Sequence, residues 1–246
     1  MSAALLGPVT HRDDRAPPTG LQRLVVSANQ RMFERGWSPP WVWSDQRCRQ
    51  YWQTRTSDAQ DNGPSSYAAK PTAVVDAMAE FWGPEVGPSS AVLEVGCNAG
   101  PNIEHLRQLG YARLSGIEIN PAALEEMRSR FPELAKTADI HEGSLEQVLP
   151  RFADSSVDVV FSMAVLHHIH PSCHAVFGEM VRVARSYICV IEPETITVSH
   201  IFARDYGRVF ERLGCTMIRR KEFHPASLAG VDAAYAGYVA RLFRVP

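Results

Sequence analysis

The chain has 246 residues, 45 % of them hydrophobic, which is enough to bury the core of one large domain with or without an appendage. Its 25 basic and 27 acidic residues give a formal net charge of -2, and no long block carries a single sign. This balance supplies no field that would attract nucleic acid or an anionic membrane. We therefore expect neither as a partner.

The cysteines and the N-terminal segment indicate a compartment. An odd number of cysteines without a C-x-x-C pair is typical of free thiols in a reducing environment. They are Cys48, Cys97, Cys173, Cys189 and Cys215. Nothing near the N-terminus reads as a signal peptide, and no window reaches the roughly 18 to 20 apolar residues of a membrane span. We expect a cytoplasmic protein.

The N-terminal part reads as a flexible tail over residues 1–20 and a helical appendage or lid over residues 21–65. Within 21–37, apolar residues at helical spacing predict an amphipathic helix: Leu21, Leu24, Val25, Ala28, Met32 and Phe33. Four of the five tryptophans lie in this part: Trp37, Trp41, Trp43 and Trp52. They either pack the appendage onto the main domain or cover a substrate pocket, and both interpretations stay open. The turn-rich stretch 57–66 is the expected boundary.

The main domain, residues 66–246, begins with a predicted helix over 71–82 and continues with alternating strands and helices. Strands are expected at 91–97, 113–119, 138–144, 157–163 and 186–192, and helices at 101–110, 121–131, 145–152 and 173–184. Continuous apolar strands between helices predict a parallel sheet covered on both faces. After a helix at 203–214, strands at 215–223 and 233–245 predict an antiparallel C-terminal pair. The expected fold is a doubly wound, mostly parallel, seven-stranded α/β sheet.

The turn after the first strand, within VLEVGCNAGPN (residues 92–102), is the expected ligand site. Gly96 permits the sharp exit from the strand, Gly100 permits close approach of backbone to ligand, and Pro101 suits the first position of a helix. The dinucleotide pattern G-x-G-x-x-G is absent, because Asn98 and Pro101 replace two of its glycines. Glu94 is a poor neighbour for a pyrophosphate and a good one for an ammonium group.

Glu118, at the end of the second strand, is placed to accept both hydroxyls of a ribose. EVGCNAG (residues 94–100) and GIEIN (residues 116–120) resemble the motifs of class I S-adenosylmethionine-dependent methyltransferases. The motif order extends over about residues 66–216. Asn98 stands where the family has its middle glycine, a mild departure because asparagine tolerates left-handed backbone.

The resemblance implies a Rossmann-like methyltransferase fold with S-adenosylmethionine as cofactor. The implied cofactor-binding residues are Glu94, Gly96, Asn98, Gly100, Glu118, Ile119, Ser144, Leu145 and Met163. Ser144 occupies a place where such enzymes usually have an acidic residue near the adenine. Ile119 and Leu145 could flank the adenine ring or belong to the ordinary core, and the sequence does not separate the two.

The run SMAVLHHIHPSCH (residues 162–174) allows three interpretations. A metal site could use its histidines and cysteine, but Pro171 works against an early helix and no complete ligand set is present, so we expect no metal. The resemblance implies that a histidine here faces the methyl acceptor; His168 is then the first candidate for a general base and His167 the second. Each could instead merely pack the entry of the helix.

The acceptor is expected to be a small molecule. An Asn/Asp-Pro-Pro-aromatic stretch, common where nucleic-acid bases or protein glutamine are methylated, is missing here. Candidate substrate contacts are Tyr67, Glu192 and Glu194, and Lys70 could reach a carboxylate. The expected reaction is methyl transfer to an oxygen or nitrogen of a small metabolite, such as a natural-product or sugar intermediate. The alternatives are a catalytically silent cofactor-binding partner subunit and, with less support, a nicotinamide-dependent oxidoreductase.

Overall fold

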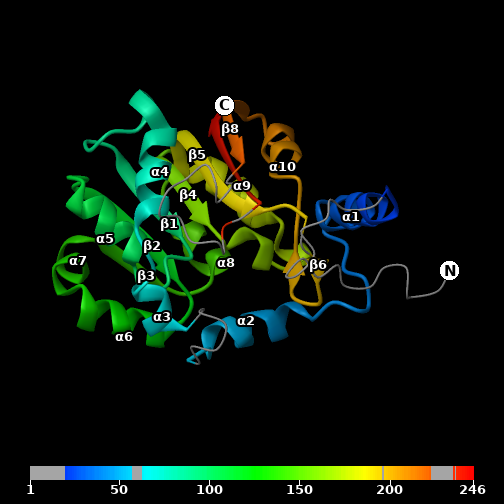
Figure 1. Ribbon diagram of the computed structural model, residues 1–246, viewed down its shortest axis with the longest axis horizontal. Helices are drawn as coiled ribbons and strands as arrows, with labels where there is room; N and C mark the ends of the chain where they lie inside the picture. Colours follow the sequence, from blue (N-terminus) through cyan, green and yellow to red (C-terminus); the bar gives the residue numbers. More distant parts are fainter. Residues whose placement is uncertain (1–19, 57–62, 196, 223–234, 236) are drawn as a thin grey trace.

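The computed structural model describes residues 20–56, 63–195, 197–222, 235 and 237–246 (Figure 1). The expected tail before residue 20 and residues 57–62 of the expected boundary lie outside the described residues. Within the described part of the chain, no helix is both long and apolar enough to cross a membrane.

A seven-stranded sheet forms the centre of the molecule, in the order β3-β2-β1-β4-β5-β9-β8. Its strands are β1 (Ala91–Val95), β2 (Arg113–Glu118), β3 (Asp139–Glu142), β4 (Val157–Met163), β5 (Ala184–Pro193), β8 (Thr216–Glu222) and β9 (Tyr238–Arg244). β1 to β5 pair in parallel, whereas β9 is antiparallel to both β5 and β8. The expected fold class and the antiparallel C-terminal pair are confirmed.

Helices cover both faces of this sheet, because the apolar strands present side chains in both directions. One core cluster includes side chains of α4 (Ala73–Trp82), α5 (Pro101–Gln108), α6 (Pro121–Arg130) and α7 (Pro132–Thr137). The other includes side chains of α8 (Leu145–Val148), α9 (Ala175–Val183) and α10 (Tyr206–Arg212). Trp82, completely buried, packs edge-on against Phe161 of β4 with ring centroids 5.6 Å apart.

Several short elements were not expected from the sequence. They are α2 (Asp45–Gln53), α3 (Pro64–Ala68), α7 and a hairpin of β6 (Thr197–Val198) and β7 (Ile201–Phe202). Short 3-10 turns are η3 (Gly83–Glu85), η4 (Leu149–Arg151), η5 (Leu166–His168) and η6 (Pro171–Cys173). Elements this short have too little periodicity to be recognised, and contacts with the rest of the fold stabilise them.

The buried face of α1 (Gly20–Phe33) differs from the expected apolar stripe. Leu24 is 69 % exposed, whereas Asn29 and Gln30 are buried together with Phe33. Gln30 Nε2 donates a 2.7 Å hydrogen bond to the carbonyl oxygen of Glu194, and the ring of Phe33 packs edge-on against Phe202. Gln30 therefore lies on the buried face of this helix because it finds a hydrogen-bond acceptor in the main domain.

Glu34, just after α1, joins the appendage to α10. Its side chain is only 1 % exposed, and its carboxylate pairs with Arg208 at 3.0 Å and Arg212 at 3.1 Å. Substitution Glu34→Gln should lower the free energy of unfolding by about 1–3 kcal/mol, because two guanidinium groups lose their counter-charge. Denaturant unfolding measures this loss. The matched control is Glu133→Gln, an exposed ion pair with Lys136, where the change should stay under about 0.5 kcal/mol; equal losses would contradict the assignment.

Candidate functional site

The turn between β1 and α5 adopts left-handed backbone at three positions. The φ angles are +74° at Gly96, +49° at Asn98 and +77° at Gly100. A Cβ at Gly96 would lie 2.6 Å from Val165, and one at Gly100 would lie 2.7 Å from Met127. Glycine at position 100 is therefore explained by φ and by tight packing against α6, rather than by the close ligand approach that we expected there.

Asn98 stabilises its own strained conformation. Its Oδ1 accepts a 2.7 Å hydrogen bond from the N–H of Ala99, and its own N–H donates at 2.8 Å to Oε2 of Glu118. Asparagine is among the few residues that tolerate this region of φ, because its side chain can bond locally. The side chain thus supports a turn that glycine makes in the family pattern.

Glu118 ends β2 and is buried beneath that turn. Its second oxygen, Oε1, accepts from the N–H of Asn120 at 2.8 Å. Burial raises the pKa of Glu118, while the N–H groups of Asn98 and Asn120 act in the opposite direction. Because each carboxylate oxygen has further acceptor capacity, both oxygens can take another donor.

Glu94 lies on β1 with its side chain completely buried. Asn102 Nδ2 donates to Oε1 at 2.7 Å, but Oε2 has no hydrogen-bond partner among the described residues. Burial raises the pKa of Glu94 to about 8. Tyr67, on α3, belongs to the same region, since Glu94 and a hydrogen bond with Asn102 both influence the pKa of its hydroxyl, which burial raises well above 10.

The residues expected to contact an adenine are divided between site and core. Ser144, at the N-terminus of α8, is buried and forms a capping box with Gln147, whose Oε1 accepts from the N–H of Ser144 at 3.4 Å. Ile119 is partly exposed. Leu145 is nearly buried in the core cluster under α8 and α9, and Met163 is completely buried in the opposite one. Met163 therefore packs the core rather than lining an open surface.

Glu192, expected as a substrate contact, is instead completely buried and fully engaged by the loop after β4. Its carboxylate accepts from Ser162 Oγ at 2.5 Å, from the N–H groups of Val165 at 3.0 Å and Leu166 at 2.9 Å, and from the N–H of His167 at 3.5 Å. The ring nitrogen Nδ1 of His167 lies 2.7 Å from Oε2. This geometry indicates that Glu192 organises the loop instead of meeting a ligand.

Arg204 holds the opposite side of the same loop. Its guanidinium, completely buried, donates to the carbonyl oxygens of Leu166 at 3.2 Å, Phe202 at 2.9 Å and Ile169 at 2.8 Å. Burial lowers the pKa of Arg204 from its usual value. The buried carboxylate of Glu192 thus accepts hydrogen bonds from the N–H groups of this loop, and the buried guanidinium of Arg204 donates hydrogen bonds to its carbonyl groups.

His168 lies in an aromatic environment. Its ring centroid is 3.8 Å from that of His167, 4.3 Å from that of Trp52 on α2, and 6.5 Å from that of His200. Its Nδ1 is buried without a hydrogen-bond partner in the described structure. Desolvation, followed by the neighbouring imidazoles, lowers the pKa of His168 well below 6.5.

His170, in the same run, bonds to two serines. His170 bonds through Nε2 to Ser38 Oγ at 3.2 Å and through Nδ1 to Ser172 Oγ at 2.7 Å. Among the described residues, the one group of three potential ligands is Asp45, Glu146 and Cys173. This group includes neither His167 nor His168.

Contacts of α2 hold it along the carboxyl edge of the sheet, and Figure 1 shows it between α3 and β6. Asn120 Nδ2 donates to the carbonyl oxygen of Arg55, just after α2, at 2.7 Å. Trp43 stacks on His200 with ring centroids 4.7 Å apart. Trp37, in contrast, is 67 % exposed. Two of the four tryptophans of the appendage, at positions 43 and 52, therefore contact imidazoles at the site.

Glu194, the other candidate substrate contact, is paired within the chain. Its carboxylate forms an ion pair with Arg241 and accepts from the N–H of Tyr206 at 3.3 Å. Burial raises the pKa of Glu194 to about 7, although Arg241 opposes the shift. This carboxylate connects β5 to β9 and α10.

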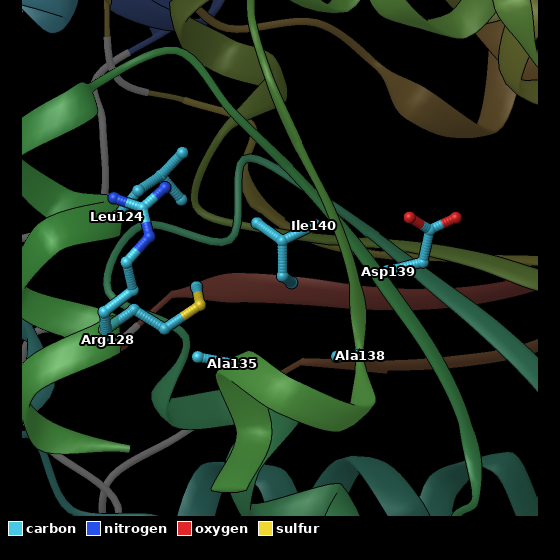
Figure 2. A pocket seen from close by; sticks show the side chains of 7 residues that line it. Leu124, Arg128, Ala135, Ala138, Asp139 and Ile140 are labelled. Atoms are coloured by element: carbon cyan, nitrogen blue, oxygen red, sulfur yellow. The ribbon is translucent and has the colours of Figure 1, made fainter. Parts of the chain in front are cut away.

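A cavity of about 260 Å³ lies elsewhere, between α6, α7 and the amino end of β3 (Figure 2). It is lined by Leu124, Met127, Arg128, Ala135, Ala138, Asp139 and Ile140. None of the expected site residues borders it.

The role of Asn98 can be tested by two substitutions. Asn98→Ala should lower the free energy of unfolding by about 1–2 kcal/mol, because alanine keeps neither the favourable left-handed backbone nor the side-chain hydrogen bond. Asn98→Gly should cost less than about 1 kcal/mol, since glycine adopts this φ freely. Denaturant unfolding compares them. Equal losses would show that φ is not the constraint at this position.

Comparisons with known proteins agree with this geometry. Residues 93–187 match the family described as "Methyltransferase domain". The comparison with curated proteins gives no significant match. Similar solved structures include magnesium protoporphyrin IX methyltransferase from Synechocystis PCC 6803 with bound S-adenosylmethionine (15 % identity, 84 % of this chain, 100 % of that chain, TM-score 0.60).

Two further structures have the same fold. Geranyl diphosphate C-methyltransferase from Streptomyces coelicolor A3(2) is 13 % identical over 84 % of this chain and 98 % of its own, with a TM-score of 0.56. The [4+2]-cyclase SpnF is 15 % identical over 70 % of this chain and 80 % of its own, with a TM-score of 0.54. The family match and the shared architecture confirm the resemblance read from the motifs. Residues 93–187 thus match a methyltransferase domain, and the chain has the fold of the class I S-adenosylmethionine-dependent methyltransferases.

Proposed function

We propose that this protein transfers a methyl group from S-adenosylmethionine to an oxygen or nitrogen atom of a small metabolite. The observation that carries the proposal is the pair of buried carboxylates at the ends of neighbouring parallel strands, Glu94 and Glu118. Oε2 of Glu94 has no hydrogen-bond partner in the described structure, as expected for a group that binds a ligand cation. When bound, the cofactor supplies an electrophilic methyl group on a sulfonium.

The residues at the turn suit the two ends of this cofactor. Glu118 would accept the ribose hydroxyls, and Glu94 would face the ammonium group. The hydroxyl of Ser144, at the N-terminus of α8, would bond to the adenine, with Ile119 and Leu145 beside its ring. Asn98 would contribute through its backbone, because its N–H already fixes the carboxylate of Glu118.

A small acceptor fits the other side of the site. The appendage covers the imidazoles of His168 and His200 with Trp52 and Trp43. The formal net charge of -2 favours no nucleic acid. Two similar structures carry names of small substrates, magnesium protoporphyrin IX and geranyl diphosphate. These names support a small acceptor without identifying it.

A second candidate function is binding of the cofactor without methyl transfer, in support of another subunit. The structural similarity to a [4+2]-cyclase shows that this fold also occurs in a protein named for another reaction, so the fold alone does not establish methyl transfer. This candidate predicts cofactor binding without turnover of any acceptor.

Calorimetry with S-adenosylmethionine and with its demethylated product tests the cofactor assignment. Wild-type protein should bind both, and Glu118→Ala should weaken binding roughly tenfold or more, because a charged hydrogen-bond acceptor is worth about 1.5–3 kcal/mol. Glu133→Gln, whose side chain is exposed on α7, serves as the control. Absence of binding to the wild type, or undiminished binding to Glu118→Ala, would refute the assignment.

The raised pKa of Glu94 predicts that cofactor binding releases a proton. Because the pKa of Glu94 is about 8, its carboxyl group is largely protonated at pH 7, and a bound ammonium would favour the carboxylate. Affinity should therefore rise as pH increases toward 8. Calorimetry in buffers of different ionisation enthalpy should show release of roughly one proton at pH 7. Proton release that is the same in Glu94→Gln would remove Glu94 from the binding site.

A screen of candidate metabolites tests the reaction itself. Incubation with S-adenosylmethionine should form the demethylated cofactor together with an acceptor heavier by one methylene group, as detected by mass spectrometry. The second candidate function would be favoured instead if the protein binds the cofactor but forms no product with any metabolite class. It would also require that adding the protein raises the activity of a partner subunit.

A further inference from the structure

The loop after β4 carries two adjacent imidazoles, and the structure gives them different surroundings. A general base must be neutral before the reaction, present a free nitrogen, and be stable as a cation afterwards. Both His167 and His168 were candidates for this role. Their neighbours separate them.

His167 has a fixed proton position. Its Nδ1 lies 2.7 Å from Oε2 of Glu192, and every other group bonded to that carboxylate is a donor. A carboxylate surrounded by donors acts as an acceptor, so Nδ1 carries the hydrogen. In the neutral ring the lone pair is then on Nε2, for which no hydrogen bond occurs among the described residues.

His168 has weaker support, a backbone hydrogen bond with His200 that acts to raise its pKa. No carboxylate bonds to its ring in the described structure, and its Nδ1 is buried without a partner. The pKa of His168 lies well below 6.5, first because of burial and then because of His167 and His200. Its imidazolium would form at a high cost. The tilted contact of its ring with Trp52, at 52° between the ring planes, suits a wall of the acceptor site instead.

We propose that His167 is the general base of the methyl transfer and that Glu192 is its positioning residue, an inference that rests on the proposed function. The O–H or N–H bond of the acceptor breaks, and the proton moves to Nε2 of His167. The electron pair of the broken O–H or N–H bond remains on the acceptor atom and forms its bond to the methyl carbon. The electron pair of the methyl–sulfur bond, which breaks, remains on sulfur. The carboxylate of Glu192 stabilises the imidazolium through Nδ1–H.

Glu192 also has a structural task, which the test must separate from this one. Its bonds to the N–H groups of Val165 and Leu166 hold a loop that begins with Ala164 at φ +60°. Left-handed backbone at alanine costs about 1–2 kcal/mol, so a substitution at position 192 can disturb folding. His167→Asn avoids the problem, because the asparagine amide can still donate to Glu192 while Nε2 is lost.

The first experiment needs neither acceptor nor activity. Long-range ¹H–¹⁵N spectra of protein labelled at histidine, with the signals assigned by their loss in His167→Asn, report which ring nitrogen carries hydrogen. We expect His167 to be protonated at Nδ1 and bare at Nε2 when neutral. Hydrogen on Nε2 instead would overturn the proposal even if the cofactor binds, whereas failure of cofactor binding alone would refute only the proposed function.

The second experiment uses the acceptor found by the metabolite screen. His167→Asn should lower kcat roughly 10²-fold or more, with KM and cofactor affinity within about twofold of wild type. Glu192→Gln should also lower kcat, and adding it to His167→Asn should change kcat by less than about twofold, since Glu192 acts through His167. His168→Asn should cost less than about tenfold. Unchanged turnover in His167→Asn, or additive losses in the double variant, would overturn the assignment.

Discussion

Buried carboxylates at the carboxyl ends of the parallel strands determine the conformations of the loops around the site. Glu118 accepts a hydrogen bond from the N–H of Asn98 after β1, and Glu192 accepts hydrogen bonds from the N–H groups of residues 165–167 after β4. An unpaired buried charge costs several kcal/mol, so these loops must turn their donors inward. The left-handed backbone of Asn98 and Ala164 lies in the same two loops. Strain in the backbone is therefore offset by satisfied charge.

The buried carboxylates differ in how many hydrogen bonds they accept within the chain, and this difference separates their roles. Glu192 takes donors on both oxygens and is hidden from solvent, which suits a group that positions others. Glu118 is held by two N–H groups but keeps acceptor capacity. Glu94 has one oxygen without a partner in the described structure, and its pKa is about 8. It is therefore the carboxylate that gains most from a cationic ligand.

Local patterns predicted the parts of the molecule that depend on local constraints. Strand and helix periods predicted the sheet, and Gly96, Asn98 and Gly100 predicted the left-handed turn after β1. The buried face of α1 was missed because Gln30 bonds to Glu194, far away in the sequence. Glu192 was read as a substrate contact because the sequence shows an acidic residue at a strand end but not the donors around it. The choice between His167 and His168 likewise needed the fold, since both share one motif.

A crystal structure of the protein with S-adenosylhomocysteine tests the central claim most directly, because it shows what each carboxylate binds. The account predicts that both ribose hydroxyls lie within hydrogen-bond distance of Glu118 and that the amino group lies against Oε2 of Glu94. The loop around His167 should keep its bonds to Glu192. A nucleoside bound away from Glu118, or an amino group that leaves Glu94 without a partner, would contradict it.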